Sequence, residues 1–168
     1  MPYTVRRLGP GDEGATSALH NRWATHPTYG ATLWVSLLSG WDLPTAGRSL
    51  TNPDEPFWGA FGPGLDAFIA FAPEERRVTL LAWDFDISAA RRREAREKLI
   101  LAVCDEAAAR NIAEIWAVYP GSRATLIGIF GIYDAQGVIW STRTRPSGLK
   151  EVTYDVATLR AALQARWP

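Results

Sequence analysis

Three short strand-forming segments followed by one long helix are the most constraining pattern in this sequence. Runs rich in β-branched and aromatic residues at 57–61, 67–72 and 78–83 are separated by short Gly- and Pro-containing turns. Because these turns are too short for a crossover connection, neighbouring strands are expected to be antiparallel. A helix over residues 89–110 follows, capped at its start by Asp86 or Ser88 and at its end by Asn111. Its apolar stripe consists of Ala95, Leu99, Val103 and Ala107.

The other predicted elements flank this centre on both sides. Strands are expected at 3–8, 115–119, 138–142 and 152–156, helices at 14–24 and 157–166, a weak helix at 32–38 within a long connection, and a helical turn at 123–130. Strands and helices therefore mix along the chain. The pattern predicts the α+β class, a mixed α/β arrangement in which helices flank one central, largely antiparallel sheet. We expect a single domain over residues 1–168.

The composition excludes several classes of partner. Eighteen basic and eighteen acidic residues give a formal charge of zero, so no bulk field favours binding to nucleic acid. No apolar run approaches the roughly 20 residues of a membrane helix, and no leader-like segment opens the chain. Cys104 is the single cysteine, and together with His20 and His26 it forms no pattern typical of a metal site. We therefore expect a cytoplasmic protein with no metal, membrane or nucleic-acid partner.

Several motifs resemble one enzyme family. The segment Val5-Arg6-Arg7-Leu8-Gly9-Pro10-Gly11-Asp12 leads into the first helix, and the stretch 124–132 ends in Phe130-Gly131-Ile132. Together with the meander at 57–83, the helix at 91–111 and the strand at 115–119, these segments resemble the GCN5-related N-acetyltransferases (GNAT superfamily). The resemblance implies a GNAT-like fold, acetyl-CoA as the acyl donor, and an amine on a small molecule or a protein as the acceptor.

The resemblance is degenerate where the cofactor would bind. The family pattern R/Q-x-x-G-x-G/A uses small residues to bring backbone N–H groups close to a pyrophosphate. The matching positions here are Arg91, Glu94 and Arg96, so two bulky charged side chains replace glycines. The family tyrosine that protonates the leaving thiolate would fall near Ile127 or Gly128. The chain is therefore identified as a divergent member.

A cluster of arginines begins the long helix, where cations oppose the helix dipole. Together with Trp83 at the end of the preceding strand, these arginines are predicted to contact the cofactor and its phosphates. They are Arg91, Arg92, Arg93 and Arg96. The alternative is a solvated helix face, on which the spacing predicts the pairs Arg93–Glu97 and Glu94–Lys98.

Candidate proton-transfer groups lie on both sides of this helix. Asp84 or Asp86 would act as a general base if burial raised its pKa, and the alternative is that Asp86 or Ser88 caps the helix. Tyr133 is the tyrosine that lies near the expected position of the family acid.

Aromatic residues gather between the first helix and the meander. The resemblance implies that this region shapes the acceptor pocket, so Tyr29, Trp34 and Trp41 are predicted to bind substrate. The alternative is an interface patch, because tryptophan is enriched where proteins meet.

Two functions remain open at this point. The first is acetyl transfer from acetyl-CoA to an amine. The second is a catalytically inert GNAT-fold module that binds a protein partner in a larger assembly, for instance a viral one, which the missing glycines and the tryptophan content favour. Self-association into a homo-oligomer is compatible with either.

Overall fold

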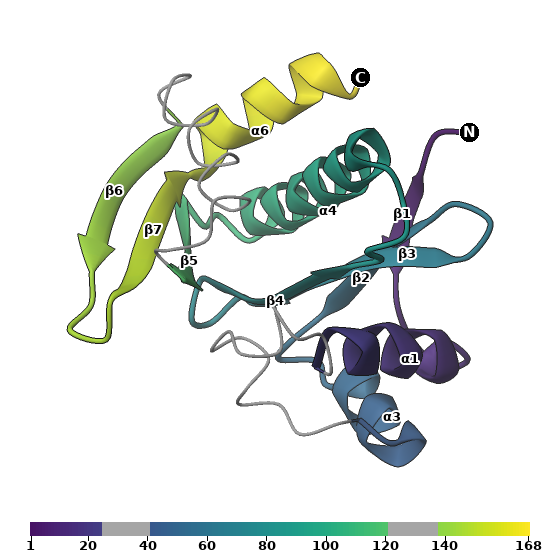
Figure 1. The fold of residues 1–168 in the computed structure, drawn as a ribbon. Helices are drawn as coiled ribbons and strands as arrows, with labels where there is room; N and C mark the ends of the chain where they lie inside the picture. The colour runs from purple at the N-terminus through teal and green to yellow at the C-terminus, as the bar shows by residue number, and fades with distance from the viewer. Residues whose placement is uncertain (25–40, 121–137) are drawn as a thin grey trace.

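The computed structural model describes residues 1–24, 41–120 and 138–168 (Figure 1). The elements in chain order are β1 (Thr4–Arg7), α1 (Glu13–Ala24), α3 (Leu43–Thr51), β2 (Phe57–Phe61), β3 (Leu65–Ala72), β4 (Arg77–Trp83), α4 (Ala89–Ala109), β5 (Glu114–Pro120), β6 (Ile139–Thr144), β7 (Leu149–Asp155) and α6 (Val156–Arg166). Each strand that the sequence predicts is present, with shifts of a few residues at the ends. The predicted helix at 32–38 and the turn at 123–130 lie outside the described residues.

One helix was not predicted. Helix α3 begins after Asp42, whose side chain accepts a hydrogen bond from the Thr45 N–H at 2.7 Å, and Pro44 occupies its first turn. An aspartate followed by a proline is a usual helix start, because proline needs no N–H partner there. The sequence signal was therefore present within the stretch that was assigned to a long connection.

The described strands form one seven-stranded sheet in the order β1-β2-β3-β4-β5-β7-β6. All neighbouring strands are antiparallel except β4 and β5, which are parallel. Helices α4 and α6 lie on one face, and α1 and α3 lie on the other (Figure 1). The predicted α+β class with one central, largely antiparallel sheet is confirmed.

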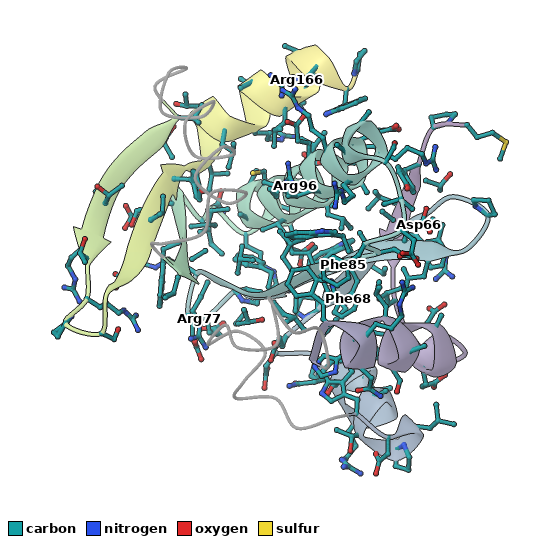
Figure 2. The ribbon with its side chains drawn as sticks, in the orientation of Figure 1. Asp66, Phe68, Arg77, Phe85, Arg96 and Arg166 are labelled. Atoms are coloured by element: carbon teal, nitrogen blue, oxygen red, sulfur yellow. The ribbon has the colours of Figure 1, made fainter. Side chains whose placement is uncertain are left out.

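Strand β3 lies at the centre of the core. Every residue from 67 to 72 is buried, because the helices cover this strand on both faces. Phe68 is fully buried and packs against Phe57 and Trp41 on the side of α1 (Figure 2). Within the described residues, no helix is both long and apolar enough to cross a membrane.

The parallel strands β4 and β5 are joined only at their beginnings. Their register contains the single pair Arg77 and Trp116, and the Trp116 N–H donates to the Arg76 carbonyl at 2.9 Å. Beyond that point β4 continues to Trp83, and the chain then turns into α4. The end of β4 and the start of α4 therefore form a junction beyond the point where β4 pairs with β5.

The ends of α4 confirm two predicted caps. The Ser88 hydroxyl accepts a hydrogen bond from the Arg91 N–H at 3.3 Å, so Ser88 caps the helix. At the other end Asn111 takes a left-handed conformation with φ of 59°, and the Ile112 N–H donates to the Ala107 carbonyl at 2.8 Å. This pair of features is a Schellman motif, which ends a helix by satisfying its last carbonyls.

A buried carboxylate joins α4 to α6. The Glu97 side chain, 3% exposed, accepts hydrogen bonds from Arg166 at 2.6 Å, Trp167 at 2.8 Å and Arg93 at 3.0 Å. Burial acts to raise the pKa of Glu97, but these donors outweigh it and hold the pKa below its usual range. The predicted Arg93–Glu97 pair is thus one part of a larger connection between the two helices.

Candidate active site

The junction between β4 and α4 presents open backbone N–H groups. Ala89 and Ala90 occupy the first two helical positions, both are exposed, and no described residue accepts a hydrogen bond from their N–H groups. The N–H groups in the first turn of a helix have no partner within the helix and lie at the positive end of its dipole. Helix α4, with 21 residues and no acid in its first turn, can therefore hold an anion at this end.

The arginines that begin α4 diverge rather than converge. Arg91 lies over the Tyr3 ring at 4.1 Å and donates to the Tyr3 hydroxyl at 3.2 Å, whereas Arg93 pairs with Glu97. Arg96 lies over the Trp83 ring, 5.8 Å from its centroid. Arg91, Arg92 and Arg93 are successive and point about 100° apart, so these three side chains cannot all face a single ligand. The prediction of one four-arginine cluster around phosphates is corrected in this respect.

Arg92 differs from the other three arginines. It is partly exposed, and no hydrogen bond, ion pair or ring contact of its side chain is found with the described residues. It follows Ala89 and Ala90 in the first turn and is therefore the arginine best suited to contact an anion there.

Glu94 does not crowd the helix start. Its carboxylate accepts a hydrogen bond from the Tyr3 N–H at 2.9 Å and pairs with Lys98 at 2.9 Å. Burial acts to raise the pKa of Glu94, and the Tyr3 N–H and Lys98 outweigh it so that the pKa is lowered. The predicted Glu94–Lys98 pair is confirmed, and the charged side chain that replaces a family glycine is held against β1.

Trp83 contributes to the core at this junction. Its ring is 4% exposed and packs edge-on against Trp23 with 4.5 Å between centroids, and its carbonyl accepts from the Trp23 indole N–H at 2.6 Å. Trp23 also stacks on Phe85. The Trp83 side chain therefore packs in the core and fixes the end of β4, and the expected contact between the end of this strand and the cofactor stays a prediction.

Asp84 and Asp86 are brought together by one arginine. Arg22 of α1 lies 3.0 Å from Asp84 and 2.8 Å from Asp86, and the Asp86 N–H donates to Asp84 at 2.9 Å. Burial acts to raise the pKa of Asp84, but the Asp86 N–H and Arg22 outweigh it and lower the pKa. The condition on which Asp84 would act as a general base, a pKa raised by burial, is therefore not met.

Trp41 is the described member of the predicted aromatic pocket. Asn21 binds both its N–H and its carbonyl, at 2.7 and 2.8 Å, and the Ser17 hydroxyl donates to the same carbonyl. Its ring is 8% exposed and stacks on His20 at 4.1 Å. The Trp41 ring therefore packs in the core. No local pattern predicts the contact with Asn21, because it joins residues 20 positions apart.

Three other predicted residues, Tyr29, Trp34 and Tyr133, lie outside the described residues. Among the residues that the structure describes, no group of three or more His, Cys, Asp or Glu side chains could hold a metal ion.

Comparison with known proteins shows what this architecture is similar to. No protein-family model matches the sequence, and no curated protein is similar to it in sequence. A putative acetyltransferase from Salmonella typhimurium, solved with its cofactor acetyl-CoA, superposes with a TM-score of 0.66 at 15% identity, covering 93% of this chain and 95% of its own. A probable acetyltransferase from Staphylococcus epidermidis gives 0.64 at 13% identity, with coverages of 91% and 98%.

A third solved structure extends the comparison to an enzyme named for a protein acceptor. The ribosomal-protein-S18-alanine N-acetyltransferase from Escherichia coli superposes with a TM-score of 0.58 at 16% identity, covering 90% of each chain. Matches of this extent, at identities this low, establish a shared architecture. The chain has the fold of the GCN5-related N-acetyltransferases, as its sequence motifs predicted.

Proposed function

We propose that this protein transfers an acetyl group from acetyl-CoA to an amine on a small molecule or a protein. The observation that carries the proposal is the open start of α4, directly after β4, in a chain with the GNAT fold. Acetyl-CoA would supply an acyl group already activated as a thioester. The residues of this chain would bind and orient it.

The residues at the helix start fit the phosphate groups of such a donor. Alanine side chains at positions 89 and 90 are small enough to let an anion approach the backbone N–H groups, as glycines do in the family motif. Arg92 would add a charge-assisted contact. Glu94, turned toward β1, leaves this approach open.

The two aspartates after β4 suit a different task from the one expected. Because the pKa of Asp84 is lowered, its carboxylate stays ionised and is a weak base near neutral pH. We assign Asp84, together with Asp86 and Arg22, to fixing the loop between β4 and α4. The proton lost by the attacking amine would then pass to water, and Tyr133 is the proposed donor to the departing thiolate.

Calorimetric titration with acetyl-CoA tests the binding step. We expect wild-type protein to bind with a dissociation constant below about 1 mM, and Arg92→Glu to bind about tenfold more weakly. Arg48→Glu is the matched control: it makes the same change of charge on α3, where Arg48 is exposed and contacts Thr45. Equal affinities for the two variants would exclude Arg92 from the site.

Release of free thiol from acetyl-CoA tests the transfer step. The acceptors would be a peptide with a free N-terminal alanine, an N-acetylated peptide that contains lysine, and an aminosugar. We expect thiol release above the rate without protein for at least one of them. Absence of acetyl-CoA binding in the titration would overturn the proposal and leave the fold as a binding module.

A further inference from the structure

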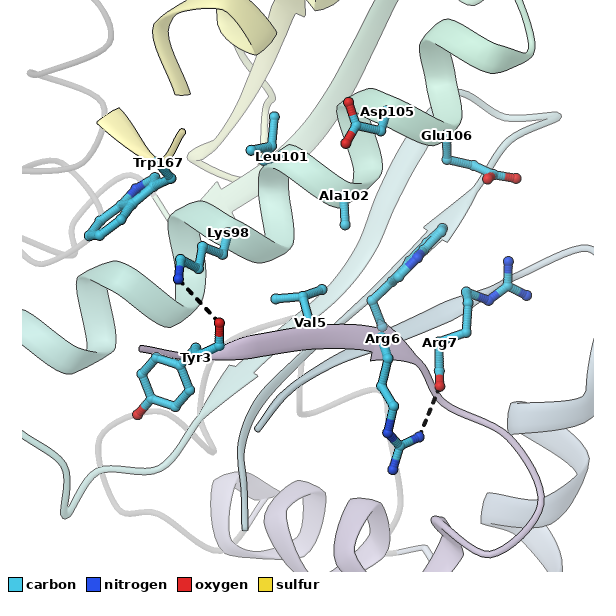
Figure 3. Close-up of a pocket in the computed structure, with 11 residues that line it drawn as sticks. Tyr3, Val5, Arg6, Arg7, Lys98, Leu101, Ala102, Asp105, Glu106 and Trp167 are labelled. Carbon is cyan, nitrogen blue, oxygen red and sulfur yellow. Dashed lines mark hydrogen bonds between the residues drawn. The ribbon is translucent and has the colours of Figure 1, made fainter. Parts of the chain in front are cut away.

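A hollow of about 540 Å³ lies between β1 and the second half of α4 (Figure 3). Val5, Leu101 and Ala102 supply apolar surface, and Trp58 and Trp167 also line it. The α4 residues that line it run from Lys98 to Glu106, whereas the proposed acetyl-CoA site uses the first turn of the same helix. The hollow is therefore separate from that site along α4.

Strand β1 is the outer strand of the sheet and exposes one backbone edge. The Leu8 N–H donates to the Phe57 carbonyl of β2 at 2.9 Å. Because antiparallel strands alternate the direction of their backbone groups, Thr4 and Arg6 also face β2, and Tyr3, Val5 and Arg7 face outward. The outward N–H and carbonyl of Tyr3 confirm this, since they bind Glu94 and Lys98 of α4 at 2.9 and 3.1 Å.

These contacts leave only a short part of the edge open. The backbone N–H and carbonyl of Tyr3 are hydrogen-bonded to α4. The Arg7 carbonyl accepts a hydrogen bond from the Arg6 guanidinium at 3.0 Å (Figure 3). No described residue bonds the outward N–H and carbonyl of Val5 or the N–H of Arg7. Natural proteins usually cover or block an outer strand, so an open stretch beside a hollow indicates a place for an added strand.

One charge in the hollow also lacks an acidic partner. The other charged residues that line the hollow all form ion pairs. These pairs are Arg6–Asp12, Lys98–Glu94, Arg160–Asp105 and Arg110–Glu106. Arg7 lies over the Trp58 ring at 4.9 Å and forms no ion pair with any described residue. The hollow thus offers an exposed guanidinium next to open backbone groups and apolar side chains.

We propose that the hollow binds an extended peptide that pairs antiparallel with β1. The peptide residue opposite Val5 would exchange both backbone hydrogen bonds with it. Residues directly opposite each other place their side chains on the same face. An aliphatic side chain opposite Val5 would therefore enter the hollow, and an acidic side chain opposite Arg7 would meet its guanidinium.

This pairing defines a sequence pattern. Moving from Val5 to Arg7 along β1 corresponds to moving two residues toward the N-terminus of an antiparallel peptide. The predicted ligand is therefore acid-x-aliphatic in that order. It spans only a few residues, because α4 already satisfies the backbone of Tyr3.

Amide NMR shifts of the full chain test the proposal with the blocked peptide Ser-Glu-Thr-Leu-Thr-Ser. We expect the Val5 and Arg7 amides to shift on titration, with a dissociation constant of about 1 mM or below. The blocked peptide Ser-Leu-Thr-Glu-Thr-Ser, with the same composition, should bind about threefold more weakly because its acid cannot reach Arg7 in the antiparallel pairing. Unchanged Val5 and Arg7 amides at about 5 mM of the first peptide would overturn the proposal.

Two variants locate the contact. Val5→Pro removes an outward N–H that the sheet does not use, so the fold should persist and peptide affinity should fall about tenfold. Arg7→Gln leaves the backbone intact and should weaken binding about threefold, with less dependence on salt. Arg48→Gln makes the same substitution on α3, where Arg48 is exposed and does not line the hollow, so it is the control and should bind as wild type.

Wild-type affinity in both Val5→Pro and Arg7→Gln would reject the site. The remaining alternative occupant is a second copy of the chain, which sedimentation of the free protein distinguishes. A dimer that Val5→Pro converts to monomer would assign the edge to self-association and overturn the peptide proposal.

Discussion

Replacing Glu97 with alanine should lower the free energy of unfolding by about 3 kcal/mol. The carboxylate is 3% exposed and is the common acceptor for Arg93 on α4 and for Arg166 and Trp167 at the C-terminal end. Its removal takes away three hydrogen bonds, leaves the partly buried donors unpaired and weakens the packing of α6 on α4. Urea unfolding monitored by circular dichroism measures the change as a lower midpoint at constant slope.

Glu106→Ala is the control for this variant. Glu106 also lies on α4 and pairs with an arginine four residues away, but its side chain is 25% exposed, whereas that of Glu97 is 3% exposed. Exposed pairs of this kind contribute about 0.5 kcal/mol or less. If both variants lost the same stability, the loss would reflect a general need for acids on α4. The buried contact between Glu97 and α6 would then not be its cause.

The lowered pKa of Glu97 also predicts how this contribution depends on pH. A carboxyl whose pKa is lower in the folded than in the unfolded state binds more protons when unfolded, so its stabilisation is present above the ordinary glutamate pKa of about 4.3. The stabilisation is lost as the pH falls through the lower folded-state pKa. The difference in unfolding free energy between wild type and Glu97→Gln should therefore shrink below about pH 4. A difference that stayed constant down to pH 2 would contradict this assignment.

Local patterns predicted most of the fold because each strand and helix carries its own signal. The runs of β-branched and aromatic residues and the turns between them predicted β2, β3 and β4, and the four-residue apolar repeat predicted α4. Both caps of α4 followed from side chains next to its ends.

Helix α3 was missed although Asp42 and Pro44 mark its start, because its nine residues include few apolar ones. Short helices depend on packing against neighbours, here the packing of Ala46 and Leu50 into the core.

The site was harder to predict because its charges are arranged by contacts between distant residues. The sequence indicated an arginine-rich helix start, and spacing alone predicted the pairs within α4. It could not show that Tyr3 engages Arg91, that Arg22 bridges Asp84 and Asp86, or that Asn21 holds Trp41. Each of these contacts joins residues at least 20 positions apart. A pKa raised by burial was the condition for Asp84 to act as a base, and the Asp86 N–H together with Arg22, 62 positions away, lowers that pKa instead.

The variant Ala90→Glu should weaken acetyl-CoA binding roughly 100-fold while leaving the protein folded. Ala90 is exposed in the first turn of α4, where its N–H has no described partner. A carboxylate there would repel the phosphates of the ligand and compete for the same positive end of the helix. The same carboxylate interacts favourably with the helix dipole, so the thermal midpoint should stay constant or rise slightly. Lost binding and retained stability together would exclude unfolding as the cause.

Ala109→Glu provides the matched control at the opposite end of the same helix. Ala109 is exposed and is the last residue of α4, so the substitution and the change of charge are identical. Ala109 lies at the negative end of the helix dipole, so an acid there should cost about 0.3–1 kcal/mol of stability without affecting acetyl-CoA binding. Calorimetric titration measures the acetyl-CoA affinity of both variants, and thermal unfolding measures their stability. The two substitutions should therefore have opposite effects. Ala90→Glu should lower the affinity for acetyl-CoA without lowering stability, and Ala109→Glu should lower stability without changing the affinity. Equal affinities would show that acetyl-CoA does not bind at the start of α4.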